Sequence, residues 1–198
     1  MSIPPSDRAR IVALLDFWFG APGSAERDRP REVWFARDAE FDAALRRHFL
    51  VDHERAAAGG CAAWRAEPDA TLALILLLDQ LPRNLFRGSP RAFSCDAAAL
   101  GAARHCVEGG WDRDFPVVRR WFVYMPFMHS ERLADQRRCL ELSSALRGDP
   151  DSAEEIRAAE RHHEIIARFG RFPHRNAILG RPSTEEEEAF LQEAHSSF

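Results

Sequence analysis

The side chains best suited to chemistry gather toward the carboxyl end of the chain, in the segment RHHEIIARFGRFPHRNAILGR at residues 161–181. Arginine and asparagine bind carboxylates and phosphates through paired hydrogen bonds, and histidine exchanges protons near neutral pH. His162 shares a helical face with Ile165 and Phe169, which predicts that its ring faces the core. The segment favours an anion site with an acid–base group, or else a core of mutually satisfied polar side chains. The candidates singled out within a stretch of fifteen residues are His162, Arg171, His174, Arg175 and Asn176.

A second polar segment, LLDQLPRNLFRG at Leu77–Gly88, follows a run of apolar residues. We expect a buried helix that ends by delivering Asp79 and Gln80, and then a turn at the proline. A carboxylate at the edge of an apolar helix must be paired, because an unpaired buried charge is strongly unfavourable. Asp79 is therefore expected either to anchor an arginine of the turn as an internal ion pair or to belong to a site. The turn would present Arg83, Asn84 and Arg87.

A third segment, YMPFMHSERLADQ at Tyr124–Gln136, joins two predicted helices. His129 and Glu131 would lie at the N-terminus of the second helix, where free N–H groups and the helix dipole favour an anion. Gln136 shares a face with leucines, so its amide is expected to point toward the core or a cleft. The alternative is an ordinary capped helix whose polar neighbours bond one another.

These segments supply the candidate site residues. As catalytic candidates we take His129 or His162 as general base or acid, with Glu131 as the orienting carboxylate. A metal site is a weaker alternative, because the histidines and Glu131 offer suitable atoms but no H-E-x-x-H or similar spacing occurs. No cofactor is expected. The candidate ligand-binding residues are Asp79, Arg83, Asn84, Arg87, Gln136, Arg171, His174, Arg175 and Asn176.

The elements that must position these residues are helices. Apolar residues recur at three and four positions nearly everywhere, and no alternating strand pattern is visible. About nine to ten helices with short links predict an all-α domain of antiparallel pairs. The expected helices include one capped by Ser94 and ending near Glu108, Val117–Met125 stopped by Pro126, one capped by Ser130, Asp151–Phe169 ended by Gly170, and a last one from a Ser183–Glu186 capping box to about His195.

Length and composition predict one domain over residues 1–198. At 198 residues, 45% hydrophobic and 29% charged, the chain should bury roughly 70% of its unfolded surface. The longest apolar run, Leu72–Leu78, is far too short for a membrane helix, and charged residues interrupt Met1–Phe19, which argues against a signal peptide. The four cysteines form no C-x-x-C pair, which is typical of buried thiols in a reducing compartment. We therefore expect a soluble, cytoplasmic protein.

The charged residues exclude several classes of chemistry. All 27 basic residues are arginine, so no lysine is available for a Schiff base, a phosphate-binding P-loop or a Ser–Lys nucleophile pair. A net charge of −4 and a pI near 6.1 argue against nucleic acid as a general partner.

The three segments together resemble the bacterial domain of unknown function 924 (DUF924) family over nearly the whole chain. The resemblance rests on LLDQLPRNLFRG, on F-x-Y-x-P-x-x-HSE with Gln136 five residues beyond, and on FGRFPHRNAILGR before Ser-Thr-Glu. The pairs Trp34-Phe35 and Phe41-Asp42 agree with it, and Met128 departs from it. It implies an all-α fold similar to tetratricopeptide-like right-handed superhelices, and it implies no activity. The polar positions it singles out are Asp79, Gln80, Arg83, Asn84, Arg87, His129, Ser130, Glu131, Gln136, His162, Arg171, His174, Arg175 and Asn176.

Three functional hypotheses follow. The first is a small anionic ligand held in an Arg/His/Asn-lined pocket, with acid–base catalysis as its extension. The second is a tetratricopeptide-like scaffold that binds a protein or peptide, which rests on an analogy of fold. The third is that the polar residues form a purely structural buried network. A closed polar pocket would favour the first and an open aromatic groove the second.

Overall fold

The computed structural model describes residues 2–194 and 196, which form helices and turns without a strand. The predicted all-α class is therefore confirmed. α3, the π-helical turn η3 and α4 follow one another without a break and form one continuous helix. Counted in this way, the described residues contain eight helices longer than a single short turn, slightly fewer than the nine to ten expected. The α-helices are α1 Pro5–Phe19, α2 Ala39–Ala57, α3 Pro68–Ile75, α4 Leu81–Leu85, α5 Asp96–Glu108, α6 Val117–Met128, α7 Leu133–Ser144, α8 Ala153–Phe169 and α9 Glu185–Leu191. The short elements are η1 Glu32–Trp34, η2 Ala62–Ala66, η3 Leu76–Gln80, η4 Pro90–Phe93, η5 Trp111–Asp114, η6 Pro150–Ser152 and η7 Pro173–Arg175.

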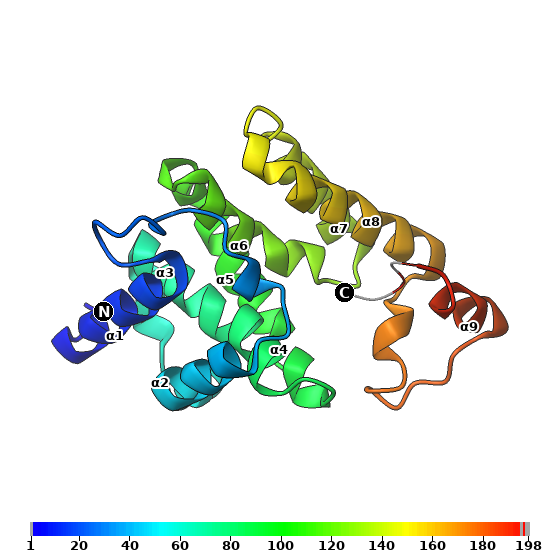
Figure 1. Cartoon of the computed structure of the whole chain (residues 1–198), viewed down its shortest axis with the longest axis horizontal. Coiled ribbons are helices and arrows are strands. Elements are labelled where there is room, and N and C mark those ends of the chain that lie inside the picture. Colours follow the sequence, from blue (N-terminus) through cyan, green and yellow to red (C-terminus); the bar gives the residue numbers. More distant parts are fainter. Residues whose placement is uncertain (1, 195, 197–198) are drawn as a thin grey trace.

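The helices pack on their sequence neighbours around α3. α5 packs on α6, α6 on α7 and α7 on α8, while α3 contacts α1, α5 and α6. α1 and α2 lie at one end of the molecule, and α9 lies at the other end, beyond the last turn of α8 (Figure 1). α9 packs chiefly on η7, so the segment after α8 stands somewhat apart.

The main core encloses α3 and η3 on all sides. Leu72 and Ile75 are fully buried, which explains why this stretch is apolar around its whole circumference. An aromatic group ties the N-terminal helices to α6, with Trp18 stacked on Trp34 and the Phe122 ring edge-on to Trp34 at 4.9 Å. A separate small core of Ile165, Ile166, Phe172 and Phe190 lies between α8 and the segment that follows it.

Two prolines expected to end helices lie inside them. α6 continues three residues past the expected end at Met125 and contains Pro126 in its last turn. In α4, Pro82 occupies the first turn, directly after the π-helical turn η3. The predicted turn at Pro82 is thus helical.

Several predicted helix starts differ by one or two residues. α5 has Cys95 as its N-cap in place of Ser94, and α7 begins after Arg132, two residues beyond Ser130. The last capping box is formed by Thr184 and Glu187, one residue beyond the expected pair, because the Thr184 hydroxyl accepts the Glu187 N–H and the Glu187 carboxylate accepts the Thr184 N–H. The C-cap at Gly170 is confirmed by its left-handed backbone at φ 69°. The expected end of the last helix near His195 lies outside the described residues.

Candidate functional site

The first element of the site is the π-helical turn Leu76–Gln80, which carries Asp79. The N–H of Leu81 donates to a carbonyl five residues back, and the turn lies directly before Pro82, which cannot donate the usual backbone hydrogen bond. π-helical turns are frequent at functional sites. This one places the fully buried Asp79 carboxylate beside His129.

Asp79 accepts hydrogen bonds from two side chains. The Nδ1 atom of His129 lies 2.8 Å from its Oδ1, and Gln80 Nε2 donates to Oδ2 at 2.6 Å. Arg83 lies one turn further along, 3.4 Å from Oδ1, and donates to the backbone oxygen of Asp79 at 2.7 Å. Burial alone would raise the pKa of Asp79, but the charge of Arg83 and the bonds from His129 and Gln80 outweigh it and lower that pKa. Asp79 is therefore a charged, fully paired carboxylate.

His129 caps the C-terminus of α6, and 14% of its side chain is exposed. Burial and the nearby Arg83 lower the pKa of His129, and the opposing effect of Asp79 does not cancel this. The imidazole is therefore neutral at neutral pH. Because Asp79 is ionised, Nδ1 carries the proton and Nε2 is left as a proton acceptor, which is the arrangement of an oriented general base.

Two arginines converge on Asp96, at the start of α5. Arg83 Nη1 lies 3.0 Å from one carboxylate oxygen and Arg175 Nη1 lies 3.1 Å from the other. Arg175 is 7% exposed and stacks on Phe93 and Phe172, each 4.6 Å from its guanidinium carbon. Burial and the like charge of Arg83 lower the pKa of Arg175 to about 10, so it stays protonated at neutral pH.

Each of these arginines keeps a buried N–H group without an acceptor. Nη2 of Arg83 and Nε of Arg175 make no hydrogen bond within the part of the chain that the structure describes. A buried donor without an acceptor is unfavourable, and an anion would supply an acceptor for such a group. The two arginines are thus the strongest indication of a ligand.

The two predicted catalytic histidines lie together. The rings of His129 and His162 have their centroids 6.2 Å apart, and His162 lies edge-on to Phe172 at 5.4 Å. His162 donates from Nδ1 to the Ala158 carbonyl at 2.7 Å, and burial lowers its pKa to about 3. His174, 5.6 Å from Phe172, also has its pKa lowered by burial, to about 4. All three histidines are neutral at neutral pH.

Glu155, on the first turn of α8, is buried on the same helix face as His162, seven residues before it. Its Oε1 atom has no hydrogen-bond partner among the described residues. Burial, reinforced by the negative charge of Asp79, raises the pKa of Glu155 to about 8. The cluster thus contains a charged carboxylate, Asp79, and a neutral carboxylic acid, Glu155.

The hydrogen bonds of Glu131 run to the segment that follows α8. It binds Arg181 through two hydrogen bonds of 2.7 and 2.9 Å and accepts the Phe172 N–H at 2.8 Å. The orienting carboxylate of His129 is Asp79, where we expected Glu131.

Four predicted ligand-binding residues are paired away from the two arginines. Asn84 and Arg87 both donate to Asp42 on α2, at 2.8 and 3.0 Å. Arg171 and Asn176 both donate to Glu187 on α9, with Arg171 forming two bonds of 2.6 and 2.7 Å. These ion pairs and hydrogen bonds match the fastening network that was the alternative to a site.

Gln136 is fully buried and links the end of α6 to α7. Its Nε2 donates to the carbonyls of Met128 and Ser130 at 2.5 and 2.7 Å. Its Oε1 has no hydrogen-bond partner within residues 2–194 and 196. It therefore supports the loop that carries His129.

Sequence reasoning missed four residues that complete these contacts, because their partners are far away along the chain. Glu155 alone left a signal, since it lies two turns before His162 on one face of the predicted helix. Asp96 is 79 residues from Arg175, and Arg181 is 50 residues from Glu131. The missed residues are Asp96, Glu155, Arg181 and Glu187.

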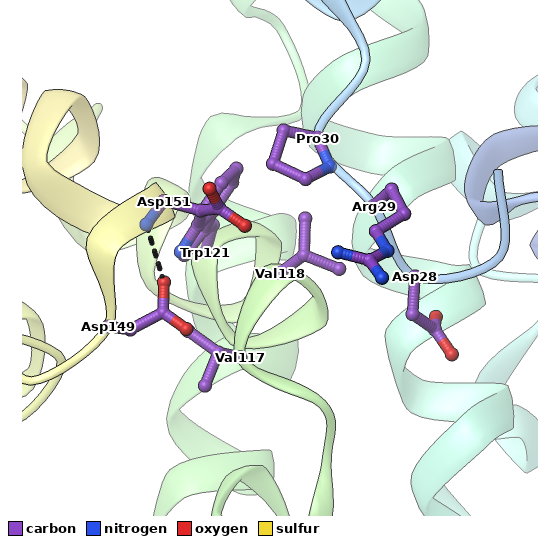
Figure 2. A pocket seen from close by; sticks show the side chains of 8 residues that line it. All are labelled: Asp28, Arg29, Pro30, Val117, Val118, Trp121, Asp149 and Asp151. Atoms are coloured by element: carbon purple, nitrogen blue, oxygen red, sulfur yellow. Dashed lines mark hydrogen bonds between the residues drawn. The ribbon is translucent and has the colours of Figure 1, made fainter.

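The described part of the chain also contains a cavity of about 230 Å³ between residues 28–30, the start of α6 and η6. Asp149 and Asp151 line one side of it, Arg29 lies on the other, and Trp121 lies between them (Figure 2). None of the predicted site residues lines this cavity. A second cavity of about 420 Å³ is lined by Arg171 together with residues of α8 and α9.

Within residues 2–194 and 196, no group of three or more His, Cys, Asp or Glu side chains is arranged to hold a metal ion. Nor does any helix of this part have both the length and the apolar composition needed to cross a bilayer.

The fold and the cluster define a helical protein with a buried Asp–His pair next to Arg83, and with two arginines that share Asp96. The chain belongs to the family described as "Bacterial protein of unknown function (DUF924)", which matches residues 14–195. A solved structure of a protein of unknown function from Agrobacterium tumefaciens is similar, with a TM-score of 0.82 and 36% sequence identity over 93% of this chain and 98% of that one. No curated protein matches.

Proposed function

We propose that this protein binds a small carboxylate or phosphate between Arg83 and Arg175 and that His129 acts on it as a general base. The observation that carries the proposal is the pair of buried guanidinium N–H groups without acceptors, beside an oriented neutral imidazole. Arginine N–H groups are well suited to carboxylate and phosphate oxygens. The bound anion would accept from the two arginines.

The chemistry that fits is proton transfer. His129 Nε2 would take a proton from a ligand held by the arginines, and the imidazolium formed would be stabilised by the charge of Asp79. His162 lies next to His129 and would complete the wall of the site. The four cysteines, all free and buried, fit the proposed cytoplasmic setting.

A structural role for the arginines is the competing explanation. The chain offers a close match for its test, because Arg119 is also 7% exposed, pairs with Asp28 at 2.6 Å, and lies over an aromatic ring, that of Phe19. If Arg175 were only a fastener, its removal should resemble the removal of Arg119 in every measurement.

The test is a thermal-shift screen of wild type, Arg175→Ala and Arg119→Ala against inorganic phosphate, phosphorylated metabolites and small carboxylates. A ligand at about 100 times its Kd stabilises the native state by roughly 2.7 kcal/mol, which raises the Tm by several degrees. We expect a hit that Arg119→Ala retains and Arg175→Ala loses. A hit that both variants retain would remove Arg175 from the site, and a blank for wild type would favour the scaffold hypothesis.

A further inference from the structure

The segment after α8, residues 171–191, forms a unit of its own. Arg171, Asn176 and Thr184 all bond to Glu187, which closes the segment on itself. Gly170 immediately precedes the segment, and its φ of 69° lies in the left-handed region that favours glycine. Figure 1 shows this segment at one end of the molecule, beyond the end of α8.

The apolar anchorage of this segment to the rest of the protein is small. Its fully buried large apolar side chains within the described residues are Phe172 and Phe190, which belong to the small core shared with α8. Phe190 contacts Phe169 at 5.0 Å between ring centroids. Two buried aromatic side chains are little compared with the main core, so the polar contacts of the segment matter for its position.

The polar contacts that anchor the segment include one at the candidate site and one near the surface. Arg175 reaches Asp96 at 3.1 Å, and Arg168 of α8 binds Glu186 at 2.9 Å near the surface. The largest anchor is Glu131, which binds Arg181 twice and also accepts the N–H of Phe172. Glu131 therefore holds both ends of the loop that carries Arg175, at Phe172 and at Arg181.

The segment covers the candidate site. Phe172 lies edge-on to His162, and Arg175 lies over Phe93 beside Asp96. Moving the segment would withdraw Arg175 and uncover His162. Glu131 follows His129 by two residues in the link between α6 and α7, so the same link positions the base and holds the segment.

We propose that residues 171–191 are a lid that opens at Gly170, and that Glu131 is the positioning residue that holds it closed through Arg181 and Phe172. The proposal rests on the proposed function in one respect, since the lid would admit the anion and then bring Arg175 onto it. Glu131 on this view is not a catalytic residue, because its bonds run to the lid.

The lid is tested without any ligand by hydrogen–deuterium exchange of the intact chain. We expect Glu131→Gln to speed exchange in residues 171–191 roughly tenfold, because charge-assisted bonds to Arg181 are lost, while α3 and α6 exchange as in wild type. Arg181→Ala should give the same pattern from the other partner, which covers the case that one variant folds poorly. The control is Glu67→Gln, which removes another paired Arg–Glu contact, with Arg8 at 2.6 and 2.8 Å.

Unchanged exchange in residues 171–191 of both variants, or an equal rise in every helix, would overturn the lid. A second arm adds inorganic phosphate to wild type. Slower exchange of the lid would support the anion site, and unchanged exchange would count against phosphate binding there while leaving the result of the variants intact. The lid and the proposed function can therefore fail separately.

Discussion

Replacing Glu155 with glutamine should favour the variant over wild type in stability increasingly as the pH rises from 5 to 8. Folding raises the pKa of Glu155 from 4.5 to about 8, so the native state holds a proton that the unfolded chain releases. A group with a raised native pKa contributes stability that is fully present below pH 4.5 and is lost as the pH rises through 8. Each pH unit between 4.5 and 8 lowers the free energy of unfolding by about 1.4 kcal/mol, which amounts to roughly 3 kcal/mol at pH 7 relative to pH 4.5. Glutamine has no proton to lose, so the variant escapes this cost.

The measurement is urea unfolding of wild type and Glu155→Gln at pH 5, 6, 7 and 8. The free energy of unfolding of the variant should gain on wild type by about 1.4 kcal/mol per pH unit. Any constant effect of the amide cancels in this comparison, as do other groups that titrate equally in both proteins. The control is the neighbouring Glu154→Gln, which makes the same change in a side chain that is 84% exposed. A difference that is constant for Glu155→Gln would refute the buried neutral acid.

Two further substitutions test the pair and its support. Asp79→Asn should lower the pKa of His129 further, because Asp79 now raises it. It should also cost about 3–5 kcal/mol of stability by removing the fully buried one of the two carboxylates that pair with Arg83. Imidazole NMR titration and urea unfolding measure the two effects, and an unchanged or higher pKa would contradict the assigned contact. Gln136→Ala should lower the free energy of unfolding by about 2–4 kcal/mol, because two carbonyls lose their donor. The control Gln192→Ala changes an exposed side chain and should cost little. Equal unfolding curves for these two variants would show that the buried amide contributes nothing.

Helical spacing predicted the class of the fold because each helix has its own apolar face. The buried helix expected before Asp79 lies inside the protein, as its unbroken apolar run Leu72–Leu78 predicts. Helix ends were predicted less well, since they depend on which residue finds a backbone partner. Pro126 is the clearest case, because a proline that stops an isolated helix is accommodated inside α6 by the surrounding core.

Candidate site residues were predicted by type, but their pairing depends on contacts between distant parts of the chain. Arg175 was singled out by its neighbours in sequence, whereas Asp96, which holds it, lies on another helix. Glu131 illustrates the limit, since a carboxylate two residues from His129 is a reasonable orienter until the fold turns it toward Arg181. Short-range spacing identifies which side chains are unusual, and tertiary packing decides what each one binds.

The division of the site between a fixed and a separately anchored part is the main mechanistic consequence of these contacts. Asp79, Arg83 and His129 come from η3, α4 and α6, which belong to or adjoin the main core, so their geometry should survive most changes outside it. Arg175 comes from residues 171–191, whose anchorage is largely polar. A ligand that needs both arginines would therefore bind only when this segment is closed, and its affinity would include the cost of closure. Glu131→Gln should then weaken binding without altering the pKa of His129, whereas Asp79→Asn should alter that pKa in the open and closed states alike.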